Sequence, residues 1–199
     1  MYVNSGYLHN SVVHFKDKSR PLVVGSCGTF RLYRRPRLPT YRPRGRIDFQ
    51  LLYVAAGKAH FFLNDEDVIV TAGHMVLYQP KEIQRYVYYG VDQTEVFWVH
   101  FTGSDVKNIL KSYGIPLTEH VFYTGQLPEY QNLYLKMIQE LKECNPHYEE
   151  LLVYYLRQLF ILVSRKLNSR SKAADYIQSE IESAIRYFSD HFQADIVID

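Results

Sequence analysis

The sequence has few of the features that assign a chain to a class at once. Its only two cysteines, Cys27 and Cys144, stand far apart and form no CxxC or metal-binding spacing, so we expect reduced thiols. Residues 1–7 have neither the basic stretch nor the apolar core of a signal peptide. No apolar run approaches the ~20 residues of a membrane span. These absences predict a soluble, cytoplasmic protein that makes no contact with a membrane.

The net charge is low, and the common catalytic motifs are missing from the sequence. The formal net charge is only +2, which is no general signature of polyanion binding. No Gly-x-Ser-x-Gly, P-loop or Rossmann glycine pattern occurs. His60, His74 and His100 stand alone, without a His-x-His pair that could hold Fe, Mn or Zn. Their spacing does not place two imidazoles on one face of a strand. The sequence therefore predicts no metal, no cofactor and no catalytic residue.

Aromatic residues, in contrast, are abundant, with 18 tyrosines, 11 phenylalanines and one tryptophan. Aromatic side chains in strands usually pack the faces of sheets. They also suit the walls of a pocket for a small molecule. We expect most of them in the packed core and some of them around a ligand.

Hydrophobic periodicity divides the chain into a β-rich half and a helical half. From about residue 22 to 101, short strand-like runs are separated by turn signals roughly every ten residues, which is typical of a sandwich or barrel. From Ser104 onward the apolar residues recur at helical spacing. This spacing predicts helices over 106–113, 133–144 and 148–167.

The helix predicted over 148–167 is the most apolar segment of the chain. Its apolar residues cover more than one helical face, so one stripe can pack on the sheet while another stays available for a partner. Symmetric dimers are the commonest oligomers. We therefore predict a homodimer that forms through Leu151, Leu152, Tyr155, Leu159 and Leu162.

The end of the sequence, residues 176–199, carries one more amphipathic pattern. Apolar residues stand at 177, 181, 184, 185, 188 and 192, on one face of a helix, and the polar residues before them read as a linker. The apolar stripe finds no partner before the chain ends, so we expect the natural protein to continue past Asp199. An ordinary C-terminal helix folded back on the core is the alternative.

Several motifs along the chain resemble the AraC/XylS family of transcription regulators. The turn in residues 54–59 is similar to the family's V-x-x-G-x-G/A, and residues 72–80 to its x-G-D-h-h-h-h-x-P hairpin, with His74 in place of the usual Asp. Residues 98–103 match W-h-H-F-x-G, residues 150–159 resemble a dimerising helix, and residues 184–192 carry an A…Y…HF pattern. Each motif alone is weak, but together and in this order they are specific.

The resemblance implies a fold and a division into domains. The fold is a mainly β, cupin-like antiparallel barrel of the jelly-roll type, followed by helices. The expected domains are an N-terminal arm at 1–19, an effector-binding barrel at 20–102 and a helical dimerisation subdomain at 103–167. A linker at 168–175 and the first helix of an incomplete helix-turn-helix domain at 176–199 follow.

The resemblance also implies ligand-binding residues. Arg42, Tyr86 and Trp98 fall at pocket positions of a sugar-binding member of the family. Arginine suits such a site because its planar fork donates two hydrogen bonds at once, and an indole stacks on the apolar face of a sugar. The family's pocket histidine is Val96 here. Alternation places His100 on the same strand face as Trp98, so His100 is a further candidate. For Tyr86, Trp98 and His100, an ordinary place in the barrel core is the alternative.

Seven arginines interrupted by prolines run from the first predicted strand to the start of the second. We interpret them mainly as a solvated loop at the mouth of the barrel, with phosphate binding as an alternative, because loop arginines without an aromatic platform are a poor signal for nucleic acid. They are Arg31, Arg34, Arg35, Arg37, Arg42, Arg44 and Arg46.

The sequence thus predicts the ligand-sensing and dimerisation region of a transcription regulator. Its effector is expected to be a small polar, uncharged or mildly acidic molecule, with a monosaccharide favoured, and DNA would be bound only through a following domain. A stand-alone metal-dependent cupin enzyme acting on a sugar is one alternative, and a sugar-binding module with no link to DNA is another. The residues do not choose among sugars, or between activation and repression.

Overall fold

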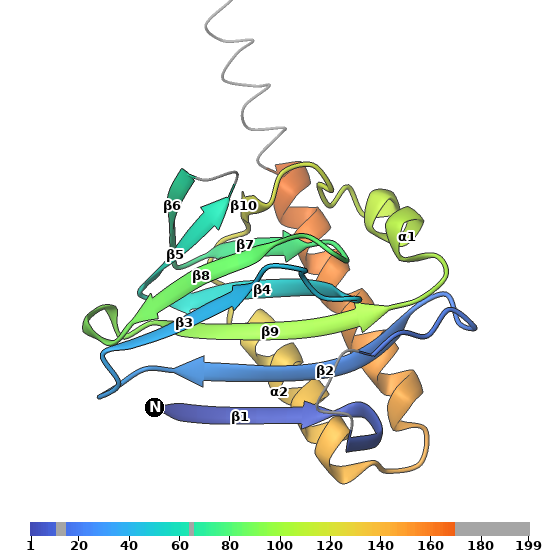
Figure 1. The fold of residues 1–199 in the computed structure, drawn as a ribbon. Helices are drawn as coiled ribbons and strands as arrows, with labels where there is room; N and C mark the ends of the chain where they lie inside the picture. Colours follow the sequence, from blue (N-terminus) through green and yellow to red (C-terminus); the bar gives the residue numbers. More distant parts are fainter. Residues whose placement is uncertain (11–14, 64–65, 170–199) are drawn as a thin grey trace, which may run out of the picture.

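The computed structural model describes residues 1–10, 15–63 and 66–169 (Figure 1). Within these residues the chain forms three layers: a four-stranded sheet, a six-stranded sheet and a layer of helices. All of the paired strands run antiparallel. None of the described helices is long and apolar enough to cross a membrane.

The chain passes several times from one sheet to the other. The six-stranded sheet has the order β1 (Tyr2–Tyr7), β2 (Val23–Arg31), β9 (Glu95–Thr102), β4 (Phe49–Ala56), β7 (His74–Tyr78) and β10 (Val121–Tyr123). The four-stranded sheet has the order β3 (Arg37–Arg42), β8 (Gln84–Tyr89), β5 (Lys58–Leu63) and β6 (Glu66–Thr71). Short 3-10 helices occupy Leu8–Asn10 and Gly90–Asp92.

This arrangement confirms the predicted cupin-like, antiparallel fold of the jelly-roll type with helices after it. The barrel consists of two facing sheets, and within the described ranges no strand ladder joins one sheet to the other. Residues 2–7 of the segment expected to be an arm form the edge strand β1, which pairs with β2. Of the linker predicted over 168–175, residues 168 and 169 are still helical and the rest lies outside the described residues, as does the helix predicted over 176–199.

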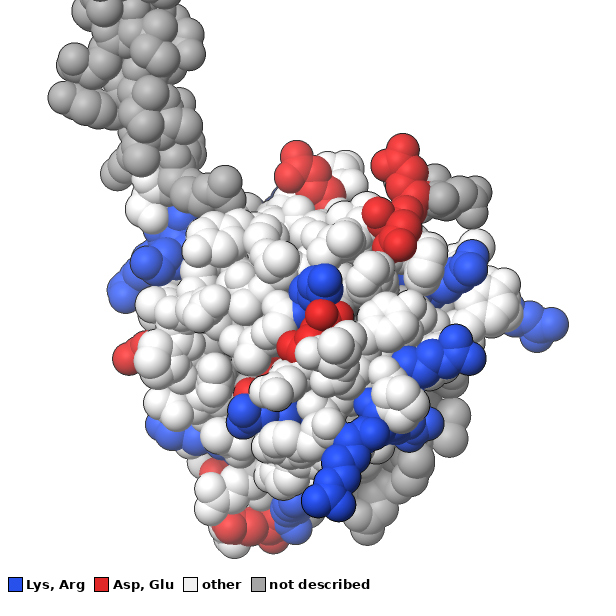
Figure 2. Space-filling model, turned by 90° about the vertical axis from the view of Figure 1, so that its left-hand side faces the viewer, with Lys and Arg blue, Asp and Glu red and all other residues white. Residues whose placement is uncertain are grey.

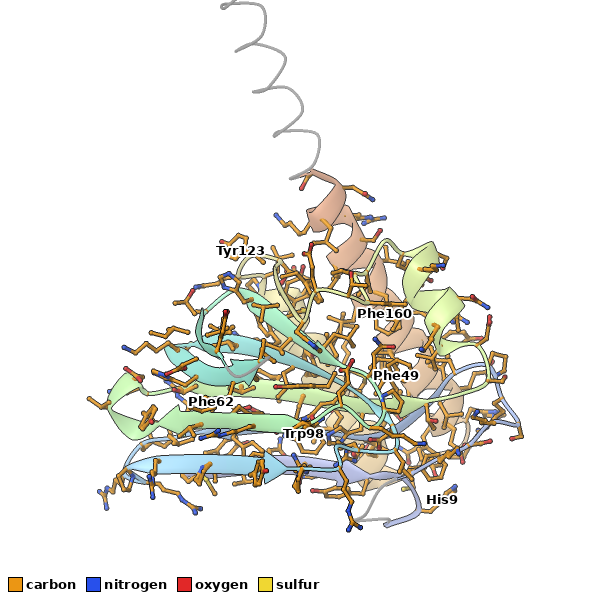
Figure 3. All side chains as sticks on the ribbon, turned by 45° about the horizontal axis from the view of Figure 1, so that its top comes forward. His9, Phe49, Phe62, Trp98, Tyr123 and Phe160 are labelled. Carbon is orange, nitrogen blue, oxygen red and sulfur yellow. The ribbon has the colours of Figure 1, made fainter. Side chains whose placement is uncertain are left out.

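A separate hydrophobic cluster packs on each face of the six-stranded sheet. Because side chains alternate along a strand, Val96 and Trp98 of β9 pack toward the four-stranded sheet, whereas Phe97 and Phe101 pack toward the helices. Trp98 and Phe160, which are labelled in Figure 3, belong to these two different clusters. Strand β9 therefore lies between the space inside the two sheets and the helical layer.

Three helices cover the outer face of the six-stranded sheet: α1 (Val106–Ser112), α2 (Pro128–Glu143) and a helix over residues 148–169. Helix α2 starts five residues before the predicted position because Pro128, which favours the first helical turn, brings Tyr130 onto the apolar face. It ends where Cys144 adopts a left-handed conformation, with φ of 50°. A Cβ on Gly6 would collide with Leu141, so this glycine allows β1 to lie against α2.

The arginine-rich stretch from Arg31 to Arg46 is more ordered than the predicted loop. Residues 37–42 form strand β3, and Pro39 fits there because β3 is an edge strand of its sheet. Arg34, Arg35 and Arg37 remain exposed. Lys and Arg side chains are spread in several groups over the face in Figure 2, with Asp and Glu also present on it.

Candidate functional site

A cavity of about 180 Å³ lies between the two sheets. Strands of both sheets line it, and Tyr7 and Phe15 of the N-terminal segment add to its wall. All four residues predicted as ligand-binding line this cavity: Arg42 from β3, Tyr86 from β8, and Trp98 and His100 from β9. The structure thus brings together side chains that are up to 58 positions apart, as counted from Arg42 to His100. Their role in binding stays a prediction.

Arg42 and Tyr86 meet through the register of the four-stranded sheet. Arg42 lies opposite Gln84, and Tyr86 is the next residue of β8 that points to the same side. Arg42 Nη1 donates hydrogen bonds to Gln84 Oε1 at 3.1 Å and to the Tyr86 hydroxyl at 3.3 Å. The guanidinium is therefore held in one direction by two neutral acceptors.

Trp98 forms much of the aromatic wall and is only 5% exposed. Its ring centroid lies 6.2 Å from that of Phe30 and 6.3 Å from that of Tyr7. Gly28 lies opposite Trp98 in the sheet, and a Cβ at this glycine would collide with the indole. The buried Trp98 Nε1 has no hydrogen-bond partner among the described residues. Since a buried donor without a partner is costly, a hydrogen bond to this N–H would be favourable.

His100 lies beside Trp98, with ring centroids 4.6 Å apart. Its Nδ1 is 2.8 Å from the hydroxyl oxygen of Ser26, which it faces across the β2–β9 ladder. Both residues are buried and line the cavity. The hydrogen bond fixes the orientation of the imidazole within the polar part of the wall.

Three polar residues that the sequence analysis did not assign to the pocket also line it: Arg46, Asp48 and Gln50. Arg46 Nε lies 2.6 Å from Asp48 Oδ1 and Arg46 Nη2 lies 2.9 Å from Asp48 Oδ2, so the pair is bidentate. Asp48 is 1% exposed and Arg46 is 9% exposed. The interpretation of this arginine as part of a solvated loop is wrong. The signal was present in the sequence, because polar residues at every second position lead into a buried strand.

His60 and His74, the other two histidines considered in the sequence analysis, lie away from the cavity lining. His60 Nδ1 is 3.2 Å from Asp67 Oδ1, and His74 Nδ1 is 3.0 Å from the carbonyl oxygen of Thr71. Within the described part of the chain, no group of three or more His, Cys, Asp or Glu side chains could hold a metal ion.

Burial changes the ionisation of several side chains in and near the cavity. It raises the pKa of Tyr88, a lining residue, well above its ordinary value. It also raises the pKa of Tyr78 between the sheets and the pKa of the Cys27 thiol under the helices. These groups are therefore neutral at physiological pH, and the charges of the cavity come from its arginine and aspartate side chains.

The residues predicted to form a dimer fall on two sides of the helix over 148–169. Leu152 and Leu159 are fully buried in the protein's own core, at 1% and 0% exposure. Leu151, Tyr155 and Leu162 are half-buried at the flank of the helix. The outer surface exposes two further residues, Tyr154 at 56% and Ile161 at 37%.

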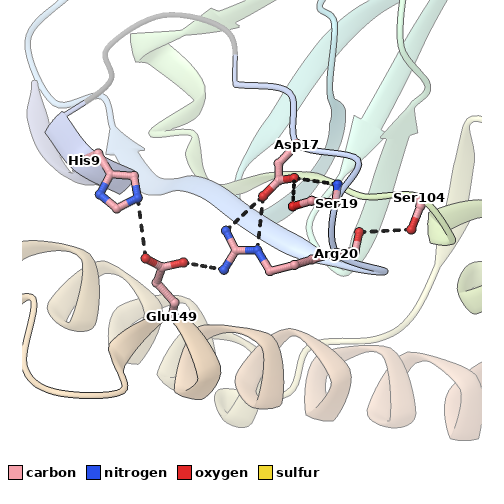
Figure 4. Close-up of polar contacts among 6 residues, drawn as sticks. All are labelled: His9, Asp17, Ser19, Arg20, Ser104 and Glu149. Carbon is pink, nitrogen blue, oxygen red and sulfur yellow. Dashed lines mark hydrogen bonds and ion pairs between the residues drawn. The ribbon is translucent and has the colours of Figure 1, made fainter.

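The N-terminal segment that contributes to the cavity wall is tied to the start of this helix (Figure 4). Glu149 accepts a hydrogen bond from Arg20 and lies 3.5 Å from His9 Nε2. Asp17 binds the same Arg20 side chain, and this contact contributes to lowering the pKa of the Asp17 carboxyl, after the larger effect of hydrogen bonds from Ser19. Polar contacts thus fasten both ends of the segment between Tyr7 and Arg20.

Comparisons with known proteins relate the chain to a family of ligand binding domains. The family model described as AraC-like ligand binding domain matches residues 26–160. Among solved structures, apo ToxT of Vibrio cholerae is similar at 12% identity and a TM-score of 0.45, with 80% of this chain and 59% of that chain covered.

Two other solved structures illustrate the range of matches. ToxT of Vibrio cholerae bound to (E)-4-(8-methylnaphthalen-1-yl)but-3-enoic acid has 16% identity and a TM-score of 0.43, with 69% of this chain and 55% of that chain covered. A cupin domain of an XRE family transcriptional regulator from Enterobacter cloacae has 9% identity and a TM-score of 0.32, with 42% of this chain and 97% of that chain covered. This chain thus spans between half and two thirds of the ToxT chains. No curated protein matches it.

Proposed function

Because this chain belongs to the family of AraC-like ligand binding domains, we propose that it is the ligand-sensing and dimerisation region of a DNA-binding transcription regulator. The observation that carries the proposal is the cavity between the sheets, where Arg42, Tyr86, Trp98 and His100 converge. Apolar walls with a few directed polar groups are typical of small-molecule sites. We propose further that the region works in the cytoplasm, in keeping with its two unpaired cysteines.

The cavity suits a monosaccharide or a close derivative. Its volume of about 180 Å³ is only slightly larger than the roughly 150 Å³ of an engineered cavity that binds benzene, so it fits a ligand of about one ring. The Trp98 face offers a stacking surface for the apolar C–H face of a sugar. The Tyr86 hydroxyl and the Arg42 guanidinium supply hydrogen bonds to ring hydroxyls.

A thermal-shift screen of pentoses, hexoses, sugar acids and disaccharides tests this proposal. A ligand at about 100 times its Kd stabilises the folded state by about 2.7 kcal/mol, which raises Tm by roughly 5–10 °C for a chain of this size. Trp98→Ala and Arg42→Ala should lose the shift. Tyr41→Ala is the matched control, because Tyr41 precedes Arg42 on β3 and is 67% exposed. Folded pocket variants that keep the full shift would show that the ligand binds elsewhere.

We also propose that the helix over 148–169 forms a homodimer with its copy in a second chain. Leu151, Tyr155 and Leu162 flank the exposed Tyr154 and Ile161, so a stripe at helical spacing is available, while Leu152 and Leu159 hold the helix on its own core. The double substitution Tyr154→Glu and Ile161→Glu should halve the mass measured by light scattering. Lys166→Glu, an exposed position on another face of the same helix, should leave the mass unchanged.

Binding of DNA belongs, in this proposal, to a domain that follows the described residues. The N-terminal segment offers a physical route from the cavity to the dimer, because Tyr7 and Phe15 line the cavity while the contacts of Arg20 and His9 reach Glu149 at the start of the helix. The natural reading frame tests the link to DNA. Continuation into two helix-turn-helix units supports the regulator, and a stop after Asp199 excludes it.

A further inference from the structure

The charges around the cavity do not cancel. Among the described residues that line it, the charged ones are Arg42, Arg46 and Asp48. Both carboxylate oxygens of Asp48 are engaged by Arg46, so this pair is neutral as a unit. Apart from the His100 imidazole, the cavity keeps one positive charge, and that charge belongs to Arg42.

No carboxylate of the described residues lies within ion-pair distance of Arg42. Its hydrogen bonds go to Gln84 and Tyr86, which are neutral. The acidic residues of neighbouring elements have other partners: Glu95 lies 3.7 Å from Arg31 Nη1 and Glu82 lies 3.7 Å from His120 Nδ1. A partly buried charge without a counter-charge is costly unless a ligand supplies one, so the site favours an anionic group at the free edge of this guanidinium.

The opposite wall of the cavity offers neutral hydrogen-bonding groups instead. Gln50 is 2% exposed, and its Oε1 accepts no hydrogen bond from any residue that the structure describes. Trp98 Nε1 is likewise a buried donor whose partner is not among those residues. Trp98 and Gln50 are diagonal neighbours on strands β9 and β4, because Leu52 lies opposite Trp98 and Gln50 lies opposite His100. One wall thus presents a cation, and the other presents an acceptor beside a donor, the pair that a hydroxyl group needs.

We propose that the effector is a hydroxylated monocarboxylate with about the size of one sugar ring, that is, a sugar acid. Its carboxylate binds the free edge of the planar Arg42 guanidinium through a charge-assisted contact, for which the guanidinium geometry matches that of a carboxylate. Its hydroxyl groups bind Gln50 Oε1 and Trp98 Nε1, next to the fixed Arg46–Asp48 pair. This inference rests on the proposed function, since it names the class of ligand for the same cavity.

The experiment compares neutral sugars with their own acids by calorimetry on the whole chain. Galactose is paired with galacturonate and galactonate, and glucose with glucuronate and gluconate. One of these acids should bind with a Kd roughly 10- to 100-fold lower than that of its neutral partner, the range expected for a hydrogen bond to a charged group. Arg42→Gln should remove this preference, whereas Arg44→Gln, at an exposed neighbouring position, should keep it.

Two further variants separate charge from shape. Arg42→Lys keeps the positive charge but removes the planar guanidinium that donates two parallel hydrogen bonds. The acid should therefore bind more weakly than to the unchanged protein, but still better than the neutral sugar. Gln50→Leu should weaken binding of the acid without changing the preference for it, and unchanged affinity would refute the hydroxyl contact. Equal binding of acid and neutral sugar overturns this inference while the proposed function stands. Absence of binding by every member of both sets counts against the proposed function itself.

Discussion

Replacing Asp48 with Asn would leave the Arg46 guanidinium buried without its counter-charge. The ion pair has side chains that are only 2% and 11% exposed, and both of its hydrogen bonds are short. Removing one partner of a buried pair typically costs about 3–5 kcal/mol, because the remaining charge is desolvated and uncompensated. For a chain of this length this corresponds to a fall in Tm of roughly 6–20 °C.

The loss is measured by urea unfolding at neutral pH, where a lower midpoint with an unchanged m-value reports a change in stability alone. Glu95→Gln is the matched control, because its pair with Arg31 is longer, at 3.7 Å, and more exposed. This variant should lose less than about 1 kcal/mol. The double variant Arg46→Met with Asp48→Leu should recover most of the stability, since apolar replacement of a whole buried pair is often neutral. Equal losses for Asp48→Asn and Glu95→Gln would refute the argument.

Three further outcomes follow from burial. Cys144 is exposed and should react with a thiol reagent in the folded protein, whereas Cys27 is buried with a raised pKa and should react only on unfolding. Burial raises the pKa of Tyr130 from 10 to about 12, so its contribution to stability is complete below pH 10 and is lost as pH rises to about 12, as alkaline urea titrations followed by tyrosinate absorbance would show. Gly28→Val should displace the Trp98 indole, so the free energy of ligand binding should fall by more than the free energy of unfolding. An unchanged ligand affinity would contradict this prediction.

Periodicity in the sequence predicted the change from strands to helices along the chain, because side chains repeat every two residues in a strand and about every 3.6 residues in a helix. Alternation along residues 95–102 put Trp98 and His100 on one face, and the structure has both of them in the cavity wall. Arg42 was assigned through resemblance, and it lines the same cavity from the opposite sheet. The distances between strands could not be predicted in this way, because they depend on the register of non-local ladders such as β3 with β8.

The differences from the sequence analysis have separate physical causes. Arg46 was placed in solvent because arginine usually is, and only the ion pair with Asp48 explains its burial. Periodicity showed two apolar stripes on the helix over 148–169 but not which of them faces the core. Leu152 and Leu159 proved to be core residues, so their apolar character reflects packing within one chain.

The position of β9 explains how an occupied cavity could reach the helices. Trp98 and His100 face the cavity, while Phe97 and Phe101, one position away on the same strand, contact Tyr134 and Phe160 with ring centroids 5.5 Å and 5.6 Å apart. Protein interiors are close-packed, so a displacement on one face of a strand is transmitted to the other face. A ligand can nevertheless bias the helical layer only by as much as its affinity differs between two arrangements of that layer. In the proposed sensor, contacts made to Trp98 are therefore better placed for signalling than contacts made to Arg42, because β3 lies in the other sheet and the described helices pack on the six-stranded sheet instead.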